Sequence, residues 1–380
     1  MNGERLYLDH AASAPLRSGA LAAMLDAAGV VGNPASLHAS GRRAKALLED
    51  AREALATALG AHPLEVVLTS GGSEADSIAL WSGWSARRTE RPRVLVGATE
   101  HPAVLAAAGR IPGTTVVPVD ADGRIERPAL GSLAGPDVAL LSVHTVNNET
   151  GTLHPVADLA EEAHRHGAWF HTDAVQAPGH VPFDFGASVA DLASVSAHKV
   201  GGPVGIGALL VRRGVRLPPY GLGGGQEDGV RSGTQPVLLA AGFAAALREA
   251  VAEQAGEAVR LSSLRSRLVA GLLGSVDRIR VNGGDGVSPA ILNVTVEGTR
   301  ADDVLLLLDR EGIDASTGSA CRAGVHQPSE VLLAMGRTPA EASASIRFSF
   351  GPTTADADVE RLLGVLPGVV AAARDAFGRG

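Results

Sequence analysis

The segment Ser194-Val195-Ser196-Ala197-His198-Lys199-Val200-Gly201-Gly202-Pro203 joins a predicted strand to a loop. The apolar run from Leu192 to Val195 is typical of the end of a buried strand, and the closing glycines and proline end regular structure. Lys199 should therefore stand where a strand opens into a loop. It is one of only two lysines in a chain whose other basic residues are arginines. An amine can lose its proton and act as a nucleophile, whereas a guanidinium stays protonated, so the pattern favours a free amine at position 199. A chain that simply prefers arginine would give the same count.

The composition is that of a globular protein larger than one ordinary domain. The chain has 380 residues, of which 45% are hydrophobic and 19% charged, and its net charge is −8. This acidic balance argues against direct nucleic-acid binding. We find no signal peptide and no apolar run long enough to span a bilayer, and we expect a cytoplasmic enzyme. Cys321 is the only cysteine, so we expect neither an internal disulfide nor a metal site.

The order of apolar runs predicts an α/β fold with a mostly parallel, seven-stranded sheet flanked by helices. The seven predicted strands are 65–68, 93–96, 115–119, 138–143, 169–171, 192–195 and 206–211. A helical stretch at 236–275 leads to a smaller C-terminal α/β unit, with predicted strands at 291–296 and 345–350 and a terminal helix at 356–377. We therefore expect a large domain of residues 16–255 that binds the ligand, and a small domain of residues 1–15 and 256–380. In such folds, ligands bind at the carboxyl ends of the strands.

Polar residues follow several of the predicted strands. Residues 69–76, Thr-Ser-Gly-Gly-Ser-Glu-Ala-Asp, come after the first strand and open a helix. Small residues at such a helix start can bind a phosphate through backbone N–H groups, although an ordinary capped helix would look the same. Asp173 directly follows the fifth strand, where burial would be costly without a cation nearby. An aspartate in a turn is the simpler explanation of Asp173 taken alone.

Together these groups match what pyridoxal 5′-phosphate requires. The cofactor needs an amine for covalent attachment, a carboxylate that keeps the pyridine nitrogen protonated, and an anchor for its phosphate. Lys199, Asp173 and the 69–76 segment could supply all three from one edge of one sheet. The protonated ring draws electrons from the substrate, so Asp173 would contribute to chemistry as well as to binding.

The sequence resembles the cysteine desulfurases, which are pyridoxal-phosphate enzymes of fold type I and belong to the class V aminotransferases. The resemblance extends from Tyr7-Leu8-Asp9 to Arg347-Phe348-Ser349. The matching blocks are the segments 32–36, 69–74, 99–101, 146–151, 173–176, 196–199, 223–227, 231–234 and 318–321.

This resemblance implies a role for each matching residue around the cofactor. Lys199 should bind pyridoxal phosphate covalently, Asp173 should pair with the ring nitrogen, and Gln176 should donate to the phenolic oxygen. His101 should stack on the ring and help to move protons. The phosphate should be bound by Gly72, Ser73, Ser196 and His198, and by Thr234 from the second subunit of a homodimer.

The resemblance also assigns the substrate, L-cysteine, and the nucleophile. Asn148 and Arg347 should bind the substrate carboxylate, and Cys321 should attack the substrate sulfur. The alternation in residues 345–350 places Arg347 on the polar face of a strand, where an arginine can bind a carboxylate through two hydrogen bonds, or where it could simply lie on the surface. Cys321 lies among Gly, Ser and Ala, which suits an exposed loop, and neighbouring Arg322 would favour its thiolate. A lone cysteine is more often a small buried residue.

The activity implied is conversion of L-cysteine to L-alanine, with the sulfur left as a persulfide on Cys321 for a sulfur-acceptor protein. The spacing from Cys321 to Pro328 resembles the long-loop group of the family. The alternatives are a selenocysteine lyase, another class V enzyme, or a catalytically silent binding protein. His10 departs from the family pattern, and the chain ends without the longer tail with which relatives dock an iron–sulfur scaffold. The acceptor could therefore serve iron–sulfur assembly, transfer RNA thiolation, DNA sulfur modification or a biosynthetic pathway.

Overall fold

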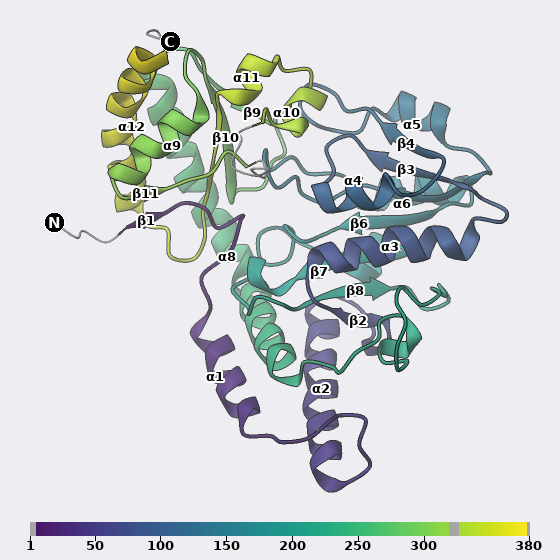
Figure 1. Cartoon of the computed structure of the whole chain (residues 1–380). Coiled ribbons are helices and arrows are strands. Elements are labelled where there is room, and N and C mark those ends of the chain that lie inside the picture. The colour runs from purple at the N-terminus through teal and green to yellow at the C-terminus, as the bar shows by residue number, and fades with distance from the viewer. Residues whose placement is uncertain (1–4, 319–326, 378–380) are drawn as a thin grey trace.

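A seven-stranded sheet forms the centre of the computed structural model, which describes residues 5–318 and 327–377 (Figure 1). The strand order is β2-β8-β7-β6-β5-β3-β4, and β8 runs in the direction opposite to the other six strands. The strands are β2 (Val66–Thr69), β3 (Arg93–Gly97), β4 (Thr114–Val117), β5 (Val138–Ser142), β6 (Trp169–Asp173), β7 (Leu192–Ser196) and β8 (Gly207–Val211). The predicted mostly parallel sheet of seven strands is confirmed.

Helices cover both faces of this sheet because its strands are apolar on both faces. Val66 and Leu68 of β2 pack into one core cluster with α2 (Ala39–Ala58), α6 (Val156–Arg165) and the first half of α8 (Val237–Ser275). Val67, between them, packs on the opposite face against α3 (Gly72–Arg87) and α4 (Pro102–Ala108). Such continuous apolar strands are typical of sheets that are buried on both sides.

A second unit lies beyond the sheet and has a core of its own. Its strands are β9 (Ile279–Asn282), β10 (Ile291–Val296) and β12 (Ser345–Ser349), paired in the order β12-β10-β9, together with the short pair β1 (Leu6–Tyr7) and β11 (Ile313–Asp314). Two helices, α9 (Ala301–Arg310) and α12 (Asp356–Phe377), pack on these strands. Leu6 and Leu8 therefore join a core made mostly of C-terminal residues.

Helix α8 connects the two cores. Phe243 and Leu247 pack with the central sheet, whereas Leu264 and Leu268 pack with the second unit. The short helices α10 (Glu330–Ala334) and α11 (Pro339–Ser343) lie between β11 and β12 in the sequence, yet Val331 and Ala342 belong to the core of the central sheet. The division into residues 16–255 and the remainder stays a prediction.

The remaining helices complete the outer layers. Two of them, α1 (Ser18–Ala28) and α2, pack along α8 at one end of the molecule (Figure 1). The other two are α5 (Arg127–Leu133) and α7 (Phe185–Ser188). No helix in the part of the chain that the structure describes is long and apolar enough to cross a bilayer.

Candidate active site

A cavity of about 380 Å³ opens at the carboxyl ends of β5, β6 and β7. Strand register aligns these ends, because Ser142 pairs with His171 and Asp173 pairs with Ser194. The predicted residues that line the cavity are Gly72, Ser73, His101, Asn148, Asp173, Gln176, Ser196, His198, Lys199 and Arg347. Thr234, which was expected to reach into a second subunit, is exposed and lies outside this cavity. Cys321 lies outside the described residues.

Lys199 ends a short 3₁₀ turn, Ala197–Lys199, that directly follows β7. Its Nζ donates hydrogen bonds to the carbonyl oxygens of Ala11 and Ala12, at 2.6 and 3.0 Å. Burial, and then the positive charge of Arg347, lower the pKa of Lys199 to about 8, against the opposing effect of Asp173. A much larger fraction of Lys199 is therefore neutral near physiological pH than for an exposed lysine, as a nucleophilic amine requires.

Asp173 ends β6, is buried and lines the cavity. Its Oδ1 accepts a hydrogen bond from the backbone N–H of Val175 at 2.9 Å. Asp173 therefore also stabilises a turn, as expected if it were an ordinary turn aspartate. Ligand atoms of Asp76, His101 and Asp173 lie within 4.8 Å of one another. Burial, and then the nearby Asp173, raise the pKa of Asp76 well above its usual value, which favours a protonated Asp76.

The start of α3 forms one wall of the cavity. Gly71 is the N-cap, and a Cβ at Gly72 would lie 2.7 Å from Cγ2 of Val175 and 3.7 Å from Cβ of Ser196. The Oγ of Ser196 is buried and makes no hydrogen bond to any described residue. The 69–76 segment therefore begins a helix and forms one side of a small polar pocket. The hydroxyl of Ser196 in this pocket still requires a hydrogen-bond partner.

The geometry of His101 fixes the position of its proton. His101 is the N-cap of α4, and its Nδ1 accepts a hydrogen bond from the backbone N–H of Ala103 at 3.1 Å. Burial lowers the pKa of His101, so the neutral ring carries its proton on Nε2. The neutral ring thus has an N–H donor at Nε2, while Nδ1 is occupied by the N–H of Ala103.

Arg347 is buried, with an exposed fraction of 3%, so the alternative of an arginine at the protein surface does not hold. Its strand is at the edge of its sheet, but Asp9 and Ser316 form bridges to Ser349 and Arg347 of this strand. One guanidinium nitrogen donates to the carbonyl oxygen of Asn148 at 2.8 Å, and another pairs with Oδ1 of Asp9 at 2.7 Å. A positive charge thus lines the cavity next to Asn148.

Gln176 is buried, and in this structure its Nε2 donates to the carbonyl oxygen of Ala11 at 2.8 Å. The same carbonyl accepts from Lys199. The N-terminal segment thus contacts two predicted site residues, a role that the sequence did not indicate.

Comparison with known proteins agrees with this geometry. The sequence matches the class-V aminotransferase family over residues 6–362. It is 45% identical to an IscS-like cysteine desulfurase of Mycobacterium tuberculosis, over 97% of each chain. The chain belongs to the class-V aminotransferases, among their cysteine desulfurases. A solved NifS-like protein matches 97% of this chain and 100% of its own, with a TM-score of 0.91 and 32% identity. A structure titled SspA in complex with cysteine matches 92% of this chain and 100% of its own, with a TM-score of 0.80 and 33% identity.

In this class-V aminotransferase, the cavity fits pyridoxal 5′-phosphate, the cofactor of the family. The unpartnered hydroxyl of Ser196 and the narrow space beside Gly72 suit a phosphate at the start of α3. The carboxylate of Asp173 suits a protonated ring nitrogen, and the amine of Lys199 suits covalent attachment. Burial and Lys199 lower the pKa of His198 to about 4, so its neutral ring could donate one hydrogen bond to a phosphate.

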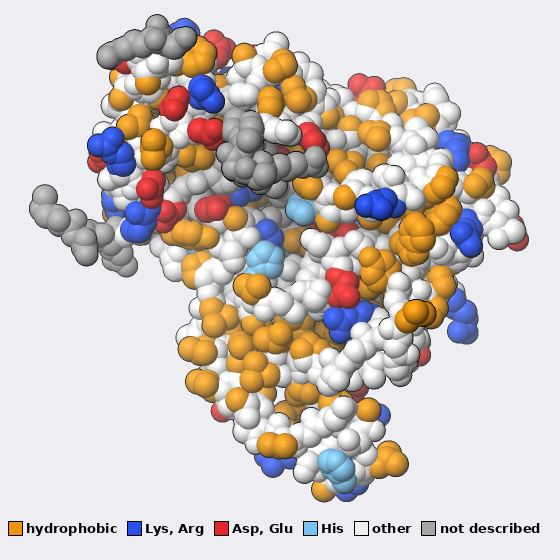
Figure 2. All heavy atoms as spheres, in the orientation of Figure 1, with side chains coloured by type: hydrophobic (Ala, Val, Ile, Leu, Met, Phe, Trp, Pro, Cys, Tyr) orange, Lys and Arg blue, Asp and Glu red, His pale blue; other side chains and the backbone are white. Residues whose placement is uncertain are grey.

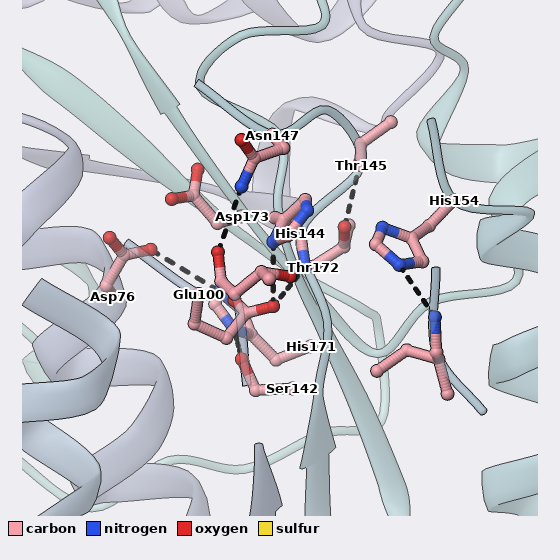
Figure 3. A network of polar contacts seen from close by, with 12 residues as sticks. Asp76, Glu100, Ser142, His144, Thr145, Asn147, His154, His171, Thr172 and Asp173 are labelled. Carbon is pink, nitrogen blue, oxygen red and sulfur yellow. Dashed lines mark hydrogen bonds and ion pairs between the residues drawn. The ribbon is translucent and has the colours of Figure 1, made fainter. Parts of the chain in front are cut away.

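The structure also places polar residues around the site to which the sequence assigned no role. Nδ1 of His144, which lines the cavity, lies 2.9 Å from Oε1 of Glu100, and a ring nitrogen of His171 lies 2.8 Å from Oγ of Ser142 (Figure 3). The other ring nitrogen of His171 lies 3.0 Å from Oγ of Ser194. Burial lowers the pKa of His171 to about 3, so it is neutral. Glu100 lies within a motif of the desulfurases, but the motif alone gives no role for its carboxylate. Its partner is 44 residues away in the sequence.

Glu149 is a further buried carboxyl that lines the cavity. Its Oε2 accepts a hydrogen bond from Oγ of Ser329 at 2.5 Å, and burial raises its pKa to about 7. Ser329 also caps α10 by accepting from the N–H of Leu332 at 3.1 Å. The hydrogen bond between Glu149 and Ser329 thus connects the loop after β5 to the start of α10.

Proposed function

We propose that this chain is a pyridoxal-phosphate-dependent cysteine desulfurase that converts L-cysteine to L-alanine and retains the sulfur as a persulfide on Cys321. One observation carries the proposal: a single cavity gathers an amine of lowered pKa, a buried carboxylate, an unpartnered hydroxyl and a buried guanidinium. When bound, the cofactor supplies an electron-poor ring that stabilises negative charge on the substrate carbon.

The residues of the chain divide the remaining work. Arg347 and Asn148 bind the substrate carboxylate, and Lys199 and His101 move protons at the substrate carbon. The Cys321 thiolate forms a bond to the substrate sulfur while the carbon–sulfur bond breaks. The electron pair of that bond stays with carbon, which is then protonated to give L-alanine. The terminal sulfur of the persulfide passes to a separate acceptor protein.

The proposal includes a homodimer. Leu21 and Leu25 of α1 are 47% and 66% exposed, and Leu37, before α2, is 90% exposed. Apolar side chains gather over this end of the molecule on the face shown in Figure 2. Contiguous exposed apolar surface is typical of protein–protein contacts. In such a dimer, Thr234 of one subunit would complete the phosphate site of the other.

Three variants test the proposal. Lys199→Ala should lose the visible absorbance of the bound cofactor together with alanine formation. Cys321→Ser should keep the absorbance but form L-alanine from L-cysteine about 100-fold more slowly or not at all. Lys45→Ala, which removes the other lysine from the exposed side of α2, is the matched control and should behave as the wild type. Retained absorbance in Lys199→Ala, or undiminished turnover in Cys321→Ser, would refute the assigned roles.

Substrate comparison separates this activity from those of its relatives. A selenocysteine lyase or an aminotransferase would use the same cofactor residues. L-Cysteine, L-selenocysteine and a keto acid with an amino donor should therefore be offered in parallel. We expect alanine and persulfide from L-cysteine. Turnover restricted to selenocysteine or to the keto acid would replace the proposal.

A further inference from the structure

Asp9 and Arg347 form an ion pair between segments 338 residues apart in the sequence. The guanidinium nitrogen lies 2.7 Å from Oδ1 of Asp9, and the side chains of Arg347 and Asp9 are 4% and 23% exposed. The backbone next to Asp9 lies beside β12, because the N–H of Ser349 donates to the carbonyl oxygen of Leu8 at 2.8 Å. This pair is therefore much less exposed than ordinary surface ion pairs, which contribute little to stability.

The guanidinium of Arg347 has N–H donors that the pair with Asp9 does not use. A guanidinium has five N–H donors, of which two are accounted for by Asp9 and the carbonyl oxygen of Asn148. Its Nε is buried and has no hydrogen-bond partner within the described residues. An unsatisfied buried donor is costly, and this one belongs to a side chain that lines the cavity. The arrangement suits a further acceptor, such as a carboxylate that enters with the substrate.

Asp9 is itself held in place by a turn. Its carbonyl oxygen accepts from the hydroxyl of Tyr7 at 3.1 Å and from the backbone N–H of Ala12 at 3.0 Å. The same hydroxyl proton is shared with the carbonyl oxygen of Ser13, which lies 2.8 Å from the Tyr7 oxygen. Two and three residues further along the same turn, the carbonyl oxygens of Ala11 and Ala12 accept from the amine of Lys199. One turn therefore contacts the group proposed to act at the amino end of the substrate and the group proposed to bind its carboxylate.

We propose that Asp9 is a positioning residue that fixes the guanidinium of Arg347 so that its remaining N–H groups meet the substrate carboxylate. This inference rests on the proposed function, because it takes Arg347 as the carboxylate site. Asp9 does not contact the substrate in this view. It sets the orientation of Arg347, as a charge-assisted hydrogen bond does when one side chain holds another.

The test measures the equilibrium binding of two probes to the cofactor-loaded protein. The change in visible absorbance reports the binding. L-Alanine carries a carboxylate, and ethylamine is the same molecule without it. Asp9→Ala should weaken L-alanine binding by about tenfold and leave ethylamine binding within about twofold of the wild type. Asp9→Asn keeps an oxygen that accepts from Arg347 and should restore L-alanine binding to within about threefold. Asp314→Ala removes a more exposed aspartate that pairs with Arg5 at 2.5 Å, and it should bind both probes normally.

The second part of the test compares Asp9→Ala in the presence and absence of Arg347, using Arg347→Ala. When Arg347 is absent, adding Asp9→Ala should cause no further loss of L-alanine affinity. Asp9 would be merely structural if Asp9→Ala weakened both probes equally, if its effect persisted without Arg347, or if Asp9→Asn failed to rescue. Equal L-alanine and ethylamine losses in Arg347→Ala would instead refute Arg347 as the carboxylate site, which is a failure of the proposed function. Should Asp9→Ala not fold, Asp9→Ser, whose hydroxyl is too short to reach Arg347, makes the same comparison.

Discussion

Burial changes the acid–base behaviour of several residues at this site, and the neighbouring charges decide by how much. Burial lowers the pKa of Lys199 to about 8 and that of His198 to about 4, and it raises that of Glu149 to about 7. Each shift favours the neutral form, as expected for groups removed from water. The carboxylates of Asp173 and Asp9 oppose the shift of Lys199, whereas Arg347 adds to it. The pKa of the Lys199 amine therefore reflects burial together with opposing effects of Arg347 and the two aspartates.

The pH dependence of cofactor capture follows from this pKa. Only the neutral amine of Lys199 can attack the cofactor, so the capture rate of the cofactor-free protein should rise through about pH 8. Below that value the rate should fall by about tenfold per pH unit, because the neutral fraction of the amine falls in that way. Stopped-flow absorbance after mixing with pyridoxal 5′-phosphate measures it. A midpoint near 10.5, the usual value for lysine, would show that the burial in this structure does not act on the amine.

At the scale of elements, the site is built where strands end and a helix begins. Parallel pairing of β5, β6 and β7 aligns their carboxyl ends, so Ser142, Asp173 and Ser196 approach one region from three separate segments. The start of α3 closes this region, and the closeness of Val175 to Gly72 determines how much space remains there. Val175, in the loop after β6, therefore limits the size of the side chain that fits at position 72.

A pair of substitutions tests this packing. Gly72→Ala places a Cβ 2.7 Å from Cγ2 of Val175, which should cost about 1–3 kcal/mol of unfolding free energy and weaken cofactor binding. Val175→Ala removes that methyl group, so the double variant should recover most of the loss. Denaturant unfolding and cofactor titration measure both quantities. If Val175→Ala only added to the loss, the contact between these two side chains would not be the cause.

At the scale of the whole molecule, distant parts of the chain meet at one site. The N-terminal turn at Asp9 reaches the cavity because β1 pairs with β11 and Leu8 packs in the core of the second unit. The long helix α8 joins both cores, and α1 lies along it with apolar side chains exposed. The apolar surface on α1 and the predicted role of Thr234 both favour a second copy of the chain as the partner.

Leu25→Asp is expected to weaken self-association. Leu25 on α1 is 66% exposed, so a charge there should leave the fold intact but oppose burial against a partner. Sedimentation should show a dimer for the wild type and a shift of at least about tenfold in dissociation constant for the variant. Leu306→Asp, at a leucine of α9 that is 62% exposed, is the matched control. A wild-type monomer, or equal effects of the two variants, would contradict the proposed dimer surface.

The sequence by itself determined the class of fold and much of the site. Apolar runs predicted all seven strands, because a doubly covered parallel sheet needs continuous apolar segments, and strand β10 and helix α12 have the predicted bounds. Ordered motifs identified Lys199, Asp173 and Arg347, which lie at one cavity. These features are local, since each depends on residues that are adjacent in the chain.

Only the tertiary structure decided which distant groups surround those residues. The burial of Arg347, its pairing with Asp9, the protonated state favoured for Asp76 and the Glu100–His144 pair all depend on contacts across long sequence separations. Local pattern contains no information about such contacts, because burial and electrostatic environment are properties of the packed molecule. For the same reason α10 and α11, which the sequence assigns to the second unit, contribute side chains to the core of the central sheet.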